Sequence, residues 1–225
     1  RGSGTPPNVV AFAASISACE KDQQWEQALE LLRSMPLVSV EPNTISLNAA
    51  LSACEKGVNW ELSSALLDAA RQEGLGSDVV TLSAGISACG KCGQWREAVE
   101  LLGGGLRRGL APNVVTLNAL LSALEGGGKW QRALALLGEM EQMRITPNEV
   151  TFCAALAAAA CSKSPKAAFR LLDAMDRLGL RRGLVACAAA AEACEGAGCW
   201  NRRPDLFFEM QELALTTCRL ARVGP

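Results

Sequence analysis

Histidine and tyrosine are absent from the 225-residue chain, and aromatic residues make up only 4% of it. Without histidine, the chain can form neither a Ser-His or Cys-His catalytic pair nor the His-containing zinc signature of nucleotide deaminases. A long apolar run is also missing, because no segment reaches the roughly 18 residues that a membrane-spanning helix needs. The net charge is only −1, so no whole-molecule basic field attracts nucleic acid, and any such site must be local.

The remaining candidates for catalytic or metal-binding chemistry are weak. Cys89 and Cys92 form one Cys-x-x-Cys pair, without the second pair that a zinc site of this type needs. The Gly-rich stretch 126–129 lacks the spacing of a phosphate-binding loop. We therefore expect no enzyme, no metal, no cofactor, no small-molecule substrate and no membrane partner.

The N-terminus begins Arg-Gly-Ser-Gly without methionine, and no apolar signal core follows. No targeting peptide is therefore visible in this chain. The sequence resembles the interior of a longer protein, and we expect it to be a piece of one.

The dominant feature is an internal repeat of 35 residues. All five tryptophans fall in one phase of it, at Trp25, Trp60, Trp95, Trp130 and Trp200, and Pro165 takes the skipped position. Cys19, Cys54, Cys89 and Cys194 also follow this spacing, so we interpret most of the ten cysteines as small buried residues in a reducing compartment. The expected division is a leading segment 1–8, repeats 9–43, 44–78, 79–113, 114–148, 149–183 and a degenerate sixth repeat 184–213, then a tail 214–225.

Each repeat carries two helical patterns. Phe12, Ile16 and Cys19 lie on one helical stripe, and a second stripe begins at Trp25, where we expect the indole to fill the seam to the next repeat. A helix pair of this size cannot bury both stripes by itself, so neighbouring repeats must stack and share a core. The expected fold is all-α, a right-handed superhelical solenoid of stacked helix-turn-helix repeats. Residues 103–105 are three glycines inside a second helix, and each costs about 1 kcal/mol relative to alanine, so we expect that helix to fray.

Several segments resemble the pentatricopeptide repeat. They include 114–121 (VVTLNALL), 25–32 (WEQALELL) and the Pro-Asn pairs that end the repeats at 42–43, 112–113 and 147–148. The resemblance covers about 8–213. Most members of that family are organellar RNA-binding proteins that act in transcript processing, stability or translation. The resemblance therefore implies a single-stranded RNA partner and a chloroplast or mitochondrial location.

The resemblance also implies a binding site, because each repeat of that family reads one RNA base with a few side chains. The residues that would sandwich the bases are Val10, Ile45, Val80, Val115, Val150 and Val185. The reader pairs would be Ala13 with Asn43, Asn48 with Asp78, Ser83 with Asn113, and Asn118 with Asn148. Under the family's code, repeats two to four favour U, A and C in 5′ to 3′ order. Ala13 cannot hydrogen-bond a base, and Cys153 with Gly183 is a poor reader pair. We therefore expect repeats one and five to be silent, that is, to read no base.

Structural roles for the same residues remain open. Asn43, Asn113 and Asn148 follow proline and are suited to turns or helix caps. Asn48 and Asn118 are harder to explain this way, because asparagine is mildly unfavourable inside a helix. Three lysines at the ends of first helices either contact phosphates or assist a helix C-terminus; they are Lys21, Lys56 and Lys91.

A rival function is a protein-binding scaffold that uses the same concave groove. The acidic pI of about 5.7, the few repeats and the silent end repeats favour it. The Asn48/Asp78 and Asn118/Asn148 pairs favour RNA. A third interpretation is a fragment whose other repeats or effector domain lie elsewhere in a longer protein.

Overall fold

The computed structural model describes residues 8–72 and 78–198, which contain helices and turns but no strand. They divide into two compact units between residues 123 and 124, and helix α7 crosses this boundary. The helices are α1 (Val9–Lys21), α2 (Trp25–Ser34), η1 (Pro36–Val38), α3 (Thr44–Lys56), α4 (Trp60–Gln72), α5 (Val79–Lys91), α6 (Trp95–Arg107), α7 (Val114–Gly126), α8 (Trp130–Gln142), α9 (Glu149–Cys161), α10 (Pro165–Arg177) and α11 (Leu184–Gly196). No helix within these ranges has both the length and the apolar character to cross a membrane.

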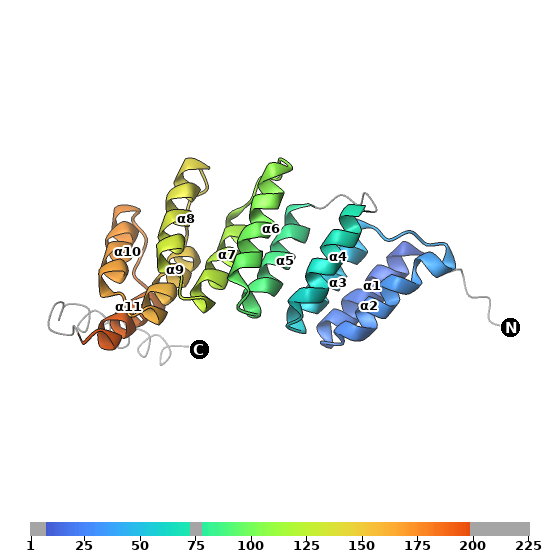
Figure 1. The fold of residues 1–225 in the computed structure, drawn as a ribbon, viewed down its shortest axis with the longest axis horizontal. Helices are drawn as coiled ribbons and strands as arrows, with labels where there is room; N and C mark the ends of the chain where they lie inside the picture. The colour runs from blue at the N-terminus through green and yellow to red at the C-terminus, as the bar shows by residue number, and fades with distance from the viewer. Residues whose placement is uncertain (1–7, 73–77, 199–225) are drawn as a thin grey trace, which may run out of the picture. The chain divides into compact units, whose positions relative to one another are not determined.

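The helices form antiparallel pairs that follow the 35-residue period. In the first unit, α1 packs against α2, α3 against α4 and α5 against α6, and Figure 1 shows these pairs side by side. The first helices also pack against one another, α1 on α3 and α3 on α5. In the second unit, α9 packs against α8, α10 and α11. The predicted second helix of the sixth repeat, Trp200 and the tail lie outside the described residues, as does most of segment 1–8.

Polar side chains start the first helices. Asp78 Oδ1 accepts a hydrogen bond of 2.7 Å from the backbone N–H of Thr81, and Thr81 Oγ1 in turn accepts one from the backbone N–H of Asp78. This reciprocal pair is a capping box, which satisfies N–H groups that a helix leaves open at its start. The same capping box begins α3 at Asn43 and α9 at Asn148. The capping role that the sequence left open for these residues is therefore observed.

One residue per repeat adopts a left-handed backbone in the turn between the paired helices. The φ angles are 58° at Gln23, 53° at Val58, 70° at Gly93, 61° at Gly128, 50° at Lys163 and 65° at Gly198, all 35 residues apart. Glycine adopts this conformation freely, whereas a β-branched side chain in it is strained. The second repeat therefore carries strain at Val58.

Replacing Val58 with glycine should raise the free energy of unfolding by about 1 kcal/mol, because a side chain in the left-handed region costs roughly 1–2 kcal/mol. Val58 is mostly exposed, so little burial is lost. The reciprocal change, Gly93→Val, places a valine at the equivalent turn and should lower stability by a similar amount. Urea denaturation of both variants measures the effect, and a decrease for Val58→Gly would contradict the assignment of strain.

The core of the first unit confirms the structural role predicted for Trp25. Ile16, Met35 and Cys54 are fully buried in one apolar cluster, and the partly buried Trp25 packs against it. The Trp25 ring also covers the turn of the next repeat, where a Cβ added at Gly57 would lie 2.3 Å from Trp25 Cδ1. Trp25 therefore fills the seam between two repeats.

The fraying predicted at 103–105 is wrong. Helix α6 runs without a break from Trp95 to Arg107. Gly105 is buried, and a Cβ there would lie 2.6 Å from Leu82 Cδ2. Its lack of a side chain lets α6 approach α5 closely, so this contact compensates for the low helix propensity of glycine.

The cysteines in the described ranges are free thiols. Of the four cysteines on the repeat spacing, Cys54, Cys89 and Cys194 are buried as predicted, whereas Cys19 is only partly buried. Cys187, which lies off that spacing, is buried as well. Burial raises the pKa of the Cys89 thiol to about 11, and the nearby Glu97 carboxylate acts in the same direction. Burial likewise raises the pKa of Cys54 to about 11, despite a hydrogen bond with Ser63 that lowers it. These thiols are protonated at neutral pH and poorly nucleophilic.

Candidate nucleic-acid interface

The six residues predicted to sandwich bases are the second residues of their helices, and all six are exposed. Their exposed fractions are 73% for Val10, 67% for Ile45, 59% for Val80 and 61% for Val115 in the first unit, and 60% for Val150 and 66% for Val185 in the second. We call them the second-position residues. A single exposed valine needs no explanation, but the same exposed β-branched residue in six repeats points to a contact outside the chain.

The reader pair of the second repeat is joined by a buried hydroxyl group. The Thr81 oxygen lies 2.6 Å from Asn48 Oδ1 and 2.7 Å from Asp78 Oδ1. Thr81 itself is fully buried, whereas Asn48 is half-buried and Asp78 is exposed. The structure thus brings Asn48 and Asp78 together and orients both through one threonine.

Hydrogen bonds set the charge state of this pair. Burial alone would raise the pKa of the Asp78 carboxyl, but hydrogen bonds from the Thr81 backbone and hydroxyl and from the Asn48 side chain together lower it. Asp78 is therefore ionised at neutral pH and presents acceptor oxygens only. Asn48 beside it offers an amide that can both donate and accept.

The third repeat has the same arrangement around its own predicted reader residues. Ser83 Oγ lies 2.7 Å from Thr116 Oγ1, and Thr116 Oγ1 donates to Asn113 Oδ1 over 3.1 Å. Thr116 is fully buried, like Thr81. Asn113 also accepts a hydrogen bond of 2.9 Å from the Thr116 backbone N–H, so it starts α7. Ser83 and Asn113 are thus brought together by the same kind of bridge.

The other repeats present their predicted readers less completely. In the first, Ala13 has no polar group, and the side chain of Ser46 turns back to the Asn43 backbone. In the fourth, Asn118 is half-buried on α7 and Asn148 caps α9. In the fifth, Cys153 is half-buried, and Gly183 leaves α11 without a side-chain cap.

Two of the predicted phosphate-contacting lysines are engaged in ion pairs between repeats. Lys56 Nζ lies 3.1 Å from Glu20 Oε1, and Lys91 Nζ lies 2.9 Å from Glu55 Oε1. Glu55 also accepts a hydrogen bond of 2.7 Å from Ser87. Lys21, the third lysine, is exposed at the end of α1. Both ion pairs are partly exposed and hold neighbouring repeats together only weakly. Each lysine can therefore exchange its glutamate partner for another anion.

The bridging hydroxyl was not anticipated from the sequence as part of the site. Its signal is nevertheless visible there, because Ser46, Thr81, Thr116 and Thr151 occupy the third position of successive repeats. All four are fully buried. A polar residue at a buried position must satisfy its hydroxyl group. The predicted reader pairs supply the partners of Thr81 and Thr116.

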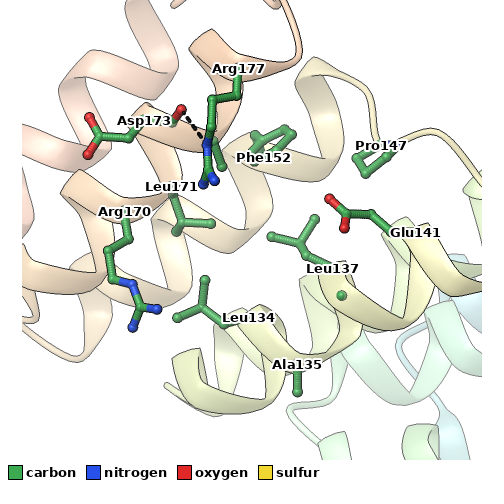
Figure 2. Close-up of a pocket in the computed structure, with 12 residues that line it drawn as sticks. Leu134, Ala135, Leu137, Glu141, Pro147, Phe152, Arg170, Leu171, Asp173 and Arg177 are labelled. Atoms are coloured by element: carbon green, nitrogen blue, oxygen red, sulfur yellow. Dashed lines mark hydrogen bonds between the residues drawn. The ribbon is translucent and has the colours of Figure 1, made fainter.

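A separate groove of about 630 Å³ lies between α8 and α10 in the second unit. Figure 2 shows Leu134, Leu137 and Leu171 facing this space, with Arg177 beside it. Arg177 Nε donates to the Asp173 backbone carbonyl over 3.3 Å. The groove is lined mainly by second helices and contains none of the predicted reader residues.

Comparison with known proteins identifies the repeat. The model of the pentatricopeptide repeat domain matches residues 2–56 and 65–124, more than half of the chain, and that of the PPR repeat family matches 112–161. The comparison with curated proteins finds no match.

Solved structures share the fold. The pentatricopeptide repeat protein PPR10 from maize is 32% identical with a TM-score of 0.76, over 92% of this chain and 30% of that one. PPR10 in complex with an 18-nt psaJ RNA element is 30% identical with a TM-score of 0.69, over 94% of this chain and 29% of that one. The PPR domain of protein-only RNase P 1 from Arabidopsis thaliana, in complex with tRNA, is 14% identical with a TM-score of 0.70, over 85% of this chain and 100% of that one.

The chain thus spans about a third or less of the length of the PPR10 chains that it matches. The predicted all-α repeat solenoid is confirmed as its fold class. The chain is a member of the pentatricopeptide repeat family.

Proposed function

We propose that the chain binds single-stranded RNA and reads it one base per repeat. The observation that carries this proposal is the pairing of two features in each of the second and third repeats. An exposed β-branched residue stands at the second position, and a polar reader pair is fixed by a buried threonine. An apolar surface suits the face of a base, and fixed polar groups suit its edge.

The chemistry favours unpaired RNA over a duplex. Base edges and faces are both accessible only where bases are unstacked and splayed apart. Asn48 and the ionised Asp78 offer an amide and a carboxylate, which complement the mixed donor and acceptor edge of uracil. Ser83 and Asn113 offer groups that suit adenine, and the proposed core U-A-C ends with a pyrimidine, usually C, at Asn118 and Asn148.

Phosphate contacts are proposed to be few. Lys56 and Lys91 must exchange Glu20 and Glu55 for phosphate oxygens, and only Lys21, Lys56 and Lys91 follow the repeat. On single strands the slope of log affinity against log salt is about −0.7 per phosphate contact, so a shallow slope is expected. Most of the selectivity then comes from the bases.

The proposed role is binding rather than catalysis. Without histidine the chain has few means of general acid–base chemistry near neutral pH. By family resemblance we place the transcript in a chloroplast or mitochondrion, where binding would support its processing, stability or translation. A protein partner on the same surface is the competing function, and it predicts no base preference.

The proposal is tested with short single-stranded RNAs that contain U-A-C and with permuted versions of the same composition. The expected result is at least about tenfold tighter binding to U-A-C, since one good bidentate base contact is worth roughly 1–3 kcal/mol. Asn48→Thr should move the preference at the first base from U toward G, following the family's code. Fluorescence anisotropy at fixed salt gives the affinities.

The matched control is Asn59→Thr, which makes the same substitution at the start of α4. Its RNA preference should remain that of the parent protein. Equal, weak binding to every RNA by the parent protein would overturn base reading and favour a protein partner instead.

A further inference from the structure

The fifth repeat lacks a side chain at its last position but holds a carboxylate in the same place. Gly183 precedes α11, and a Cβ added to it would lie 2.4 Å from Glu149 Oε1. At the equivalent position, the second and third repeats carry the readers Asp78 and Asn113. The Glu149 carboxylate, which comes from the first residue of α9, therefore fills the space that a reader side chain would enter.

The same carboxylate lies near the first reader position of that repeat. Glu149 and Cys153 are four residues apart on α9 and share one helix face. Burial raises the pKa of the Cys153 thiol, and the negative charge of Glu149 raises it further. Glu149 is thus close to both positions that would read a base, Cys153 and Gly183.

Nothing within the described ranges holds this carboxylate in a hydrogen bond or ion pair. Glu149 is exposed, and Val150 and Val185 are exposed on the two helices beside it. The guanidinium of Arg182, the residue before Gly183, forms a two-point contact with Asp176. The start of a helix favours a negative charge, and Glu149 is the first residue of α9.

We propose that Glu149 is the base-contacting residue of the fifth repeat and that it selects guanine. This inference rests on the proposed RNA-binding function. An ionised carboxylate presents two acceptor oxygens and no donor. Guanine is the base whose Watson–Crick edge offers two adjacent donors, N1–H and the N2 amino group, which match a carboxylate in a bidentate, charge-assisted contact. The protonated thiol of Cys153 adds a weak donor for the guanine O6.

The other bases fit this site less well. Uracil has one donor between two carbonyl oxygens, which the carboxylate repels, and adenine and cytosine each pair a donor with an acceptor. The fifth repeat is therefore not silent, and the proposed core extends in the 3′ direction from U-A-C to U-A-C-G.

The test uses four RNAs that differ only in the base after U-A-C. The full chain should bind the guanine version at least about tenfold tighter than the adenine version, the scale of one bidentate base contact. Glu149→Gln should reduce this preference to about twofold or less, because the amide replaces one acceptor with a donor. Gly183→Ala should reduce it similarly, since the new methyl group displaces the carboxylate while its charge is kept.

Glu139→Gln, an exposed carboxylate on α8, is the matched control and should keep the guanine preference. Binding that depends on U-A-C but treats all four following bases alike would overturn the assignment and leave the proposed function intact. A guanine preference that survives both Glu149→Gln and Gly183→Ala would also overturn it. Binding without any base dependence would overturn the proposed function itself, and the role of Glu149 with it.

Discussion

Replacing Val80 and Val115 together with aspartate should lower the affinity for U-A-C RNA by at least about a hundredfold. Each valine loses an apolar contact with a base, and each new carboxylate repels the phosphate backbone. We take about 1.4 kcal/mol per site, which is tenfold in affinity. Fold stability should change little, because both residues are exposed and both lie in the first turn of a helix, where aspartate is favourable.

The control for this double substitution places the same two charges elsewhere in the first unit. Leu37 and Val38 are exposed in η1 and carry no predicted contact with RNA. Leu37→Asp with Val38→Asp should change the affinity by about threefold or less, the scale expected of distant charges screened by salt. Comparable losses in the two double variants would show that general charge repulsion, rather than the second-position residues, explains the effect.

Replacing Gly57 with alanine should lower the free energy of unfolding by about 1–3 kcal/mol, the usual cost of overfilling a packed site. The new methyl group would lie 2.3 Å from Trp25 Cδ1 and 2.6 Å from Trp25 Cγ, and a rigid indole cannot yield without leaving the seam. The backbone at Gly57 is right-handed, so alanine adds no conformational strain. Thermal and urea denaturation measure the loss.

The same substitution at Gly138 should have the opposite sign. A methyl group there meets nothing within 4 Å, and alanine is favoured over glycine inside a helix by about 1 kcal/mol. In a Trp25→Leu background, Gly57→Ala should cost less than about 0.5 kcal/mol, because the rigid ring is gone. If Gly57→Ala still lowered the free energy of unfolding by about 1–3 kcal/mol in that background, the clash with Trp25 would not explain the loss.

The helix pairs could be predicted from the sequence because periodicity reports burial directly. Four second helices begin at a tryptophan of the repeat, at Trp25, Trp60, Trp95 and Trp130, and the three Pro-Asn pairs come directly before α3, α7 and α9. The prediction that residues 103–105 fray failed because helix propensity describes only the local chain. The packing of Gly105 against Leu82 is a contact between two helices, which helix propensity does not include.

The candidate site was less predictable, because its decisive contacts join side chains far apart in the sequence. Thr81 bridges to Asn48 across 33 residues, and Lys56 pairs with a glutamate of the preceding repeat. Glu149 reaches the space beside Gly183 only because α9 and α11 pack together. Spacing alone identified which positions recur, but not what each side chain contacts. The reader roles of Asn48 and Asp78 therefore stay predictions.

The helix caps have a consequence for how such a chain can evolve. Asp78, Asn113 and Asn148 each start the next helix, and under the proposed function each also faces a base. Only a few residue types cap a helix well, chiefly Asn, Asp, Ser and Thr, and losing a cap costs about 1 kcal/mol. A substitution that changes the target base at these positions is therefore restricted to these few residue types. Other residues would destabilise the helix that carries the next reader.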